Sequence, residues 1–259
     1  MNIDTDAYKP AQIAALIESA GVAKARMAMG QMLTLAILAG AFIGLGAAAY
    51  IAVMTGADTT HGPTRLLGGL AFSLGLILVI VGGAELFTGN ALMVMAAVDG
   101  KITLAELLRN WGVVYAGNFI GALGLAVAFA QTGLLEAAFG ATAVQVAAAK
   151  VSLNPLEYIA KGALCNALVC LAVWLTFSAR DTAGKILAIL WPISSFVLLG
   201  LEHSVANMYL IPLGILAGAE ISFGAAAGNL VWVTVGNVIG GAGGVALAYR
   251  YAYLGGKKV

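Results

Sequence analysis

Long apolar runs dominate the chain, and they occur near residues 31–54, 66–98, 110–134, 157–178, 186–217 and 228–254. Each run is long enough to cross a hydrocarbon core of about 30 Å at a rise of about 1.5 Å per residue. The chain is 61% hydrophobic and only 10% charged, whereas soluble domains carry about 25% charged residues. The pattern therefore predicts an all-α membrane protein with six transmembrane helices.

Two of the runs, 66–98 and 186–217, are too long for one simple span. Each contains a polar interruption near its middle, around Glu85 in the first and around Glu202 and His203 in the second. Irregular backbone at membrane depth is tolerated where protein or a cavity surrounds it. We expect the second and fifth spans to be broken, each made of two half-helices joined by a short irregular segment.

The two halves of the chain share two sequence patterns. G-x-E-x-x-x-x-N begins at Gly83 and again at Gly200, and G-N-x-I-G begins at Gly117 and again at Gly236. Because three spans per half is an odd number, the second copy must be inverted across the membrane. Inverted repeats with matched broken helices are typical of transport folds and indicate a site near the bilayer midplane.

These patterns predict a single transmembrane channel domain over residues 30–259, with repeats at about 30–134 and 157–254. Residues 1–29 lack the apolar core of a secretory signal and precede this domain. Pro10 is suited to the first turn of a helix. We expect an amphipathic helix that lies on the membrane or on a neighbouring subunit, the alternative being a loosely ordered tail. Its apolar positions recur at helical spacing and are Ile13, Leu16, Ile17 and Ala20.

Lysine and arginine predict the orientation, since they are enriched in cytoplasmic loops. Six spans place both termini on one side of the membrane, and three basic residues fall on the other side: Arg65, Lys150 and Lys161. The side of the termini carries Lys9, Lys24, Arg26, Lys101, Arg109, Arg180, Lys185, Arg250, Lys257 and Lys258. Ten basic residues on the side of the termini, against three on the other side, predict that both termini are cytoplasmic.

His203 is the most distinctive candidate for chemistry. It lies inside an apolar run at a predicted helix break, where an ionisable group is costly and usually faces a cavity or a partner. A free imidazole titrates near pH 6.5, so it can exchange a proton in the physiological range. The alternative is a structural histidine bonded to a backbone carbonyl.

Other polar residues also fall at the two breaks. Glu85 and Glu202 occupy equivalent positions in the repeats, and each could bind a proton or ion, or could accept bonds from backbone N–H groups freed by the break. Asn90 and Asn207 are paired in the same way and suit the backbone that a break leaves open. Thr88 has a hydroxyl that could reach a pore. Half-helices beginning here would aim partial positive charge at the midplane, which favours an anion.

Lys150 and the cysteines complete the candidates. Lys150 stands alone in a long alanine-rich outer segment, where it could concentrate anions at a vestibule or be a solvated surface lysine. Cys165 and Cys170 are the only cysteines and are five residues apart in one apolar run, which supports neither a metal site nor a disulfide framework. We expect no metal and no cofactor.

Several stretches resemble the formate/nitrite transporter family over residues 30 to 254, namely FSLGLILVIVGGAELFTGN, KGALCNALVCLAVW, GLEHSVANMYLIPLG and VTVGNVIGG. The resemblance implies an aquaporin-like fold in a bacterial or archaeal cytoplasmic (inner) membrane, assembled as a homopentamer with one pore in each subunit. It also implies a central pore histidine at His203 and a pore threonine at Thr88. Polar residues near them are implied at Asn166, Asn207 and Glu202, and an outer-vestibule lysine at Lys150. Apolar constrictions are implied at Phe72, Leu76, Leu86, Phe87, Val169 and Phe196.

The function implied is a pH-dependent channel for formate, in which the anion accepts a proton near His203 and crosses as the neutral acid. Nitrite, hydrosulfide and lactate are the alternatives within the family. A membrane enzyme is disfavoured, because neighbouring Glu202, His203 and Ser204 point about 100° apart on a helix and cannot form a triad. A neutral-solute pore is disfavoured by the absence of paired Asn-Pro-Ala tripeptides.

Overall fold

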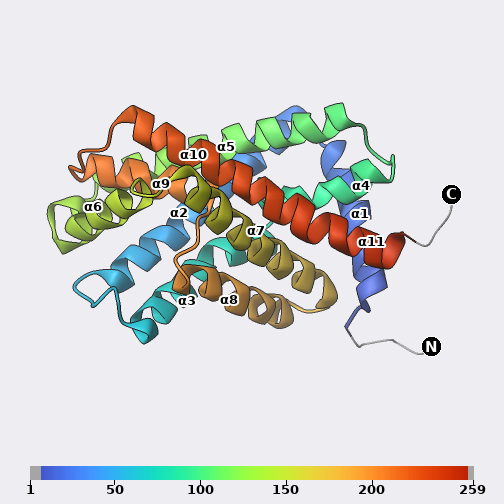
Figure 1. The fold of residues 1–259 in the computed structure, drawn as a ribbon, viewed down its shortest axis with the longest axis horizontal. Helices are drawn as coiled ribbons and strands as arrows, with labels where there is room; N and C mark the ends of the chain where they lie inside the picture. The colour runs from blue at the N-terminus through green and yellow to red at the C-terminus, as the bar shows by residue number, and fades with distance from the viewer. Residues whose placement is uncertain (1–6, 256–259) are drawn as a thin grey trace.

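The computed structural model describes residues 7–255, and every regular element in that range is a helix (Figure 1). Residues 1–6 of the N-terminal segment lie outside the described part, as do Lys257 and Lys258, which were counted for the orientation. The elements are α1 (Pro10–Ala25), α2 (Met29–Met54), α3 (Gly62–Gly82), η1 (Gly89–Met93), α4 (Val94–Val98), α5 (Leu104–Ala130), η2 (Leu134–Glu136), α6 (Ala138–Lys150), α7 (Pro155–Ser178), α8 (Thr182–Leu198), α9 (Ser204–Leu216), α10 (Phe223–Val238), the π-helical η3 (Ile239–Leu247) and α11 (Ala248–Leu254).

Five helical segments are long and apolar enough to cross a membrane: α2, α3, α5, α7 and the continuous Phe223–Leu254 segment formed by α10, η3 and α11. Three further apolar helices are shorter, namely Gly89–Val98, Thr182–Leu198 and Ser204–Leu216. The prediction of an all-helical membrane protein is confirmed. The second and fifth apolar runs are both interrupted, one between α3 and η1 and the other between α8 and α9.

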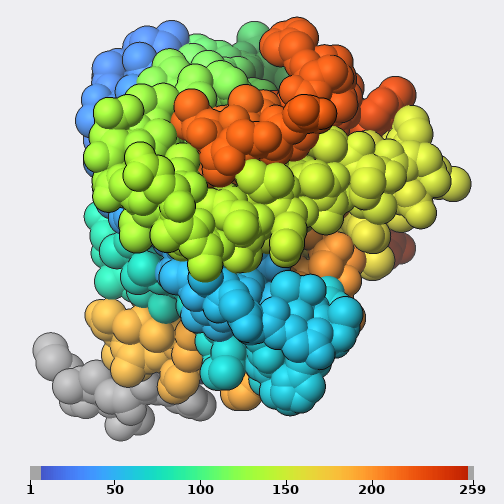
Figure 2. All heavy atoms as spheres, turned by 90° about the vertical axis from the view of Figure 1, so that its left-hand side faces the viewer, coloured from blue at the N-terminus to red at the C-terminus, as the bar shows by residue number. Residues whose placement is uncertain are grey.

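The long helices run between two ends of the molecule (Figure 1). One end, here called the α1 end, carries α1, α4 and α11, together with both termini of the described chain. The opposite end, here called the α6 end, carries α6. Figure 2 looks onto the α6 end and shows α6, in yellow-green, lying between the orange segment before and within α10 and the blue link between α2 and α3.

Helix α1 begins at Pro10 and buries one apolar face against its own chain. Ile13 and Ile17 are buried, and they pack in a cluster that includes residues of η1, α4, α7 and η3. Leu16, expected on the same face, is instead exposed. The sequence predicted a helix lying on the membrane or on a neighbouring subunit. In the structure, α1 packs against η1, α4, α7 and η3 of its own chain. The helix therefore covers the ends of the spans on this side of the molecule.

Small residues allow the spans to approach each other closely, and the last glycine of each G-N-x-I-G pattern lies at such a contact. A Cβ atom on Gly121 of α5 would lie 1.9 Å from the carbonyl oxygen of Ile37 in α2, and one on Gly240 would lie 1.9 Å from that of Ala163 in α7. Such contacts bring backbones together where lipid provides no hydrophobic drive for association.

Replacing Gly121 with alanine should therefore destabilise the protein by about 1–3 kcal/mol, because backbone atoms of α2 must move to admit the methyl group. Gly124 is the matched control, since it lies on the same helix and its Cβ would have no neighbour within 4 Å. Alanine at position 124 should be neutral or slightly stabilising, because glycine is the poorer helix former. Thermal unfolding of both variants in detergent measures the difference, and equal melting temperatures would contradict this account of the contact.

Candidate functional site

Both interrupted spans end at a glycine with positive φ. Gly83 follows α3 with φ +82°, and Gly200 follows α8 with φ +66°. This conformation is readily adopted only by glycine. The backbone then has no regular helix for a few residues before a second helix begins, at Gly89 after the first break and at Ser204 after the second. Glu85 and Thr88 lie in the first break and Glu202 and His203 in the second, whereas Asn90 and Asn207 lie in the helices that follow.

The first break is held by a network that reaches back to α1. Lys24 Nζ lies 2.5 Å from Glu85 Oε1 and 3.0 Å from Asn90 Oδ1. Asn90 Nδ2 donates to Glu85 Oε2 at 2.8 Å and to Asn110 Oδ1 at 2.9 Å. Asn110 Nδ2 donates to the backbone carbonyl of Lys24 at 3.3 Å. The buried carboxylate of Glu85 is thus compensated by one charge and one amide.

The second break is held by the same network built from α6. Lys150 Nζ lies 2.8 Å from Glu202 Oε1. Asn207 Nδ2 donates to Glu202 Oε2 at 2.7 Å and to Asn229 Oδ1 at 2.9 Å. Asn229 Nδ2 donates to the backbone carbonyl of Lys150 at 2.7 Å. Every bond has its counterpart in the first break, so Lys24 and Lys150 hold equivalent places at opposite ends of the molecule.

Two further asparagines, Asn118 and Asn237, secure the backbone at the breaks. They are the asparagines of the repeated G-N-x-I-G pattern, and both are fully buried. Each accepts one backbone N–H and donates to two backbone carbonyls at 2.8–2.9 Å. The donors are Phe87 N and Ser204 N, and the acceptors are the carbonyls of Ala36 and Glu85 for Asn118 and of Gly162 and Glu202 for Asn237.

His203 connects the two breaks. Its Nε2 atom lies 2.9 Å from Thr88 Oγ1, and its Nδ1 atom accepts the backbone N–H of Ala206 at 3.1 Å, which caps α9. Because Nδ1 accepts, a neutral imidazole carries its proton on Nε2 and donates to Thr88. Asn166 Nδ2 donates to the carbonyl of Thr88 at 3.2 Å and so fixes that residue from α7. His203, Thr88 and Asn166 are all buried.

A small cavity of about 80 Å³ lies on the α6 side of His203. It has room for an anion of a few heavy atoms, since a water molecule occupies about 30 Å³ in the liquid. Phe72 and Phe196 form part of its wall, with ring centroids 5.4 Å apart, and Phe196 stacks on His203 at 5.9 Å. Its other lining residues are Tyr50, Arg65, Lys150, Val197, Gly200, Leu201, Ala206 and Leu210.

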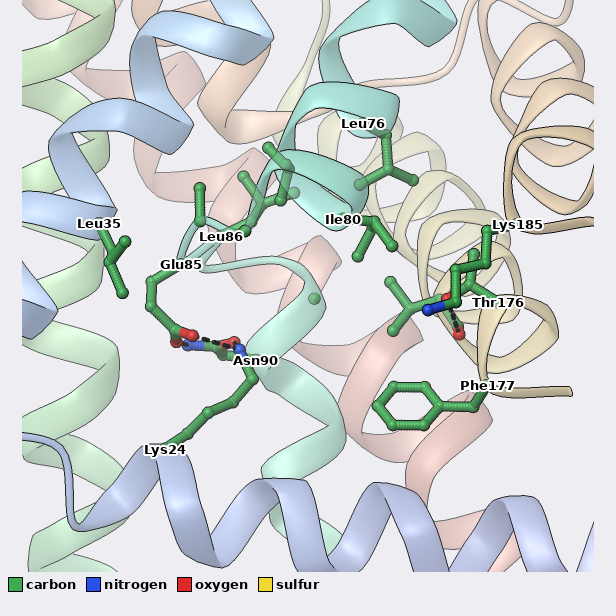
Figure 3. Close-up of a pocket in the computed structure, with 15 residues that line it drawn as sticks. Lys24, Leu35, Leu76, Ile80, Glu85, Leu86, Asn90, Thr176, Phe177 and Lys185 are labelled. Atoms are coloured by element: carbon green, nitrogen blue, oxygen red, sulfur yellow. Dashed lines mark hydrogen bonds and ion pairs between the residues drawn. The ribbon is translucent and has the colours of Figure 1, made fainter. Parts of the chain in front are cut away.

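A larger cavity of about 380 Å³ opens at the α1 end (Figure 3). Leu76 and Leu86 lie on its inner wall, and Figure 3 shows Lys24, Glu85 and Asn90 on one side with Lys185 and Thr176 on the other. Its remaining lining is mostly apolar: Leu35, Val79, Ile80, Gly83, Ala84, Gly89, Val173 and Phe177. The cavity is therefore an apolar chamber with charges at its edges.

The two cavities share no lining residue. Phe72 borders one and Leu76 the other, and these residues are one helical turn apart on α3, a rise of about 6 Å. The Thr88–His203 hydrogen bond lies in the interval between them. A solute passing along this path would therefore leave one chamber, cross an apolar interval beside His203 and reach the other.

The six expected constriction residues fall into three pairs. Phe72 and Phe196 line the α6-end cavity, and Leu76 and Leu86 line the α1-end cavity. Val169 and Phe87 are buried but line neither. The ring of Phe87 packs edge-on against Tyr115, with centroids 4.9 Å apart, and against Trp111 at 6.0 Å.

Sequence reasoning missed several residues of these networks. Asn110 and Asn229 belong to no pattern identified in the sequence, and Lys24 was counted only for orientation. Glu85 and Glu202 accept from lysine and asparagine side chains, although backbone N–H groups were the structural partners considered. The side chain of Lys150 is 18% exposed, so it is not a solvated surface lysine.

Similarity to known proteins identifies the family of the chain. A sequence model described as formate/nitrite transporter matches residues 11–251. The chain belongs to the formate/nitrite transporter family. Its membership in a transporter family confirms the prediction that the chain is not an enzyme.

Among its relatives in this family, the uncharacterized transporter YrhG of Bacillus subtilis (strain 168) is 43% identical over 249 residues, covering 95% of this chain and 93% of that protein. The formate channel FocA of Escherichia coli (strain K12) is 39% identical over 272 residues, covering 96% and 95%. A solved structure described as a pentameric formate channel with formate bound is 40% identical and superposes with a TM-score of 0.80, covering 87% of this chain and 98% of that one.

Proposed function

We propose that this protein is a channel for formate across the cytoplasmic membrane of a bacterium or archaeon. The observation that carries the proposal is the pair of cavities that are separated by a short interval at the Thr88–His203 hydrogen bond. A path with cationic residues at both ends and an apolar centre suits a small anion with a protonatable form. The formate channels among the relatives, at about 40% identity over nearly the whole chain, favour formate as that anion.

The membrane arrangement forms part of the proposal. The α3–η1–α4 segment and the α8–α9 pair act as the broken second and fifth of six spans, in an aquaporin-like inverted repeat over residues 30–134 and 157–254. The matched networks of Glu85 and Glu202 at opposite ends support the inversion. The assembly is a homopentamer, as in the related solved structure. The α1 end, with both termini, faces the cytoplasm.

The proposed mechanism follows from the cost of moving charge through an apolar interval. An ionised carboxylate in a low-dielectric region is disfavoured by several kcal/mol, on the order of the penalty for burying any single ion. His203 lines the α6-end cavity, and its Nε2 atom faces Thr88. When the ring is protonated on both nitrogens, a formate ion can accept the Nε2 proton and pass as formic acid, which leaves the neutral imidazole. The ring then takes its next proton from water in a chamber. Phe72, Leu76, Leu86 and Phe196 then exclude the hydrated anion and favour the neutral acid.

Formate flux into proteoliposomes tests the proposal, with empty liposomes as the baseline and nitrite as competitor. We expect saturable formate flux that increases as the pH falls from 7 to 5. Nitrite flux without formate flux would replace the proposal with nitrite transport, the other substrate named in the family description. Flux of neither anion would reject a formate or nitrite channel and leave hydrosulfide and lactate as candidates.

A further inference from the structure

The lysines of the two networks are poor sources of net charge for the cavities. Lys150 Nζ lies 2.8 Å from Glu202 Oε1, and Lys24 Nζ lies 2.5 Å from Glu85 Oε1. At such separations the pair acts outward as a dipole, whose field falls off faster than that of a single charge. An anion approaching either cavity therefore meets a lysine that is already compensated.

A second cation borders the α6-end cavity without such compensation. Arg65 is half-buried and lines that cavity with Lys150 and His203. Its Nη2 atom lies beside the break, since a Cβ atom on Gly200 would come within 2.9 Å of it. Within residues 7–255, the Arg65 guanidinium has no hydrogen bond or ion pair. The positive charge at this mouth is thus the charge of Arg65.

The α1-end cavity has an equivalent cation in Lys185. This residue is half-buried and lines the cavity together with Gly83 of the first break. Figure 3 shows it across the chamber from Lys24 and Glu85. No described residue forms an ion pair or a side-chain hydrogen bond with Lys185. After Lys24 and Glu85 compensate each other, one positive charge remains at this mouth as well.

The two cations hold corresponding places in the fold. Arg65 is the fourth residue of α3, which begins at Gly62, and Lys185 is the fourth residue of α8, which begins at Thr182. These helices pack against each other and run in opposite directions (Figure 1). The start of each therefore lies beside the glycine at which the other ends. The same topology that repeats the paired lysines also repeats an uncompensated cation at each mouth.

We propose that Arg65 and Lys185 are the anion-collecting residues of the two mouths, and that Lys150 and Lys24 serve to hold the breaks. The proposal rests on the proposed anion-channel function and names the charges that recruit its substrate. The substrate class is a small monocarboxylate. Arg65 offers a planar fork that matches a carboxylate with two parallel hydrogen bonds, whereas Lys185 offers a point charge.

Measuring formate uptake in vesicles of opposite orientation, so that each mouth is tested separately, tests the assignment. In right-side-out membrane vesicles, Arg65→Gln should raise the formate concentration that gives half-maximal uptake by about three- to tenfold at low salt, because a cation at a narrow mouth raises the local anion concentration. Lys185→Gln should do the same in inside-out vesicles. Both effects should shrink near 1 M salt, where the screening length is about 3 Å.

Two control variants distinguish recruitment of formate by Arg65 from the general effect of removing charge near the α6 end. Lys161→Gln removes a cation near the α6 end that lines neither cavity and should leave half-saturation unchanged. Lys150→Met combined with Glu202→Gln removes an internally compensated pair and should have a smaller effect than Arg65→Gln. If the double variant raises half-saturation more than Arg65→Gln does, Lys150 is the anion-collecting residue and the proposal is overturned.

A thiol at position 65 allows its charge to be switched in one preparation. The native Cys165 and Cys170 are buried, so an impermeant reagent should label chiefly an Arg65→Cys variant. An ammonium-bearing methanethiosulfonate should restore low half-saturation, and a sulfonate-bearing one should raise it further. If neither reagent alters formate uptake while the wild type conducts formate, the assignment of Arg65 is wrong and the channel function stands. If the wild type conducts no formate, the proposed function itself fails.

Discussion

Formate accumulation driven by an inside-alkaline pH gradient is expected to be lost when His203 is replaced with asparagine. The reason is that the neutral acid crosses the apolar interval far more easily than the anion does. A barrier difference of several kcal/mol, at a factor of ten for about each 1.4 kcal/mol, predicts at least a tenfold loss of gradient-driven uptake. Radiolabelled formate in proteoliposomes with an imposed gradient provides the measurement.

Asparagine is the informative replacement because the helix cap can survive it. His203 Nδ1 caps α9 by accepting the Ala206 N–H, and an asparagine oxygen is among the best acceptors at that position. The variant therefore removes proton exchange while preserving the start of the helix. His203→Ala, which also loses the cap, should show the same transport defect with an additional loss of stability of about 1 kcal/mol. Undiminished gradient-driven accumulation in the asparagine variant would exclude His203 as the proton donor.

Replacing Lys150 with methionine is expected to lower the free energy of unfolding by about 3–5 kcal/mol, because removing one partner leaves a buried charge uncompensated. Glu202 is 3% exposed and would keep only the Asn207 amide as a side-chain partner. Thermal unfolding in detergent should show a markedly lower melting temperature for Lys150→Met than for Lys161→Met, in which no described ion pair is broken.

A compensating variant distinguishes the ion pair from simple packing. Lys150→Met combined with Glu202→Gln removes both charges and keeps an acceptor for Asn207, so most of the lost stability should return. If the double variant is no more stable than Lys150→Met, the lysine contributes through packing of its chain and not through its charge.

The candidate site residues that could be identified from the sequence are of residue types that are rare in the segments around them. His203, Glu85 and Glu202 are ionisable residues inside apolar runs, and the cost of placing them there made them visible. Lys24 lies in a polar segment where lysine is common, and its partner Glu85 is 61 residues away. Helical periodicity describes neighbours on one element, so a pair of this kind could not be predicted from it.

The directions of the side chains at the breaks also could not be predicted from the sequence. Leu86 lines the α1-end cavity, whereas the adjacent Phe87 packs against Tyr115 of α5. Irregular backbone has no fixed period, so neighbouring residues there cannot be sorted into lining and packing positions. The G-N-x-I-G repeat was visible in the sequence, but the backbone bonds of Asn118 and Asn237 depend on where α2 and α7 pass, which the repeat alone does not specify.

The two lysine networks have a consequence for how the protein is made. All members of the Glu85 network lie between residues 24 and 110, and all members of the Glu202 network lie between residues 150 and 229. During synthesis, the first carboxylate can be neutralised within the bilayer before any of the second network has left the ribosome. Each half of the chain can thus pair its most costly charge inside the membrane with its own residues, and the Thr88–His203 contact can form last, between the two halves.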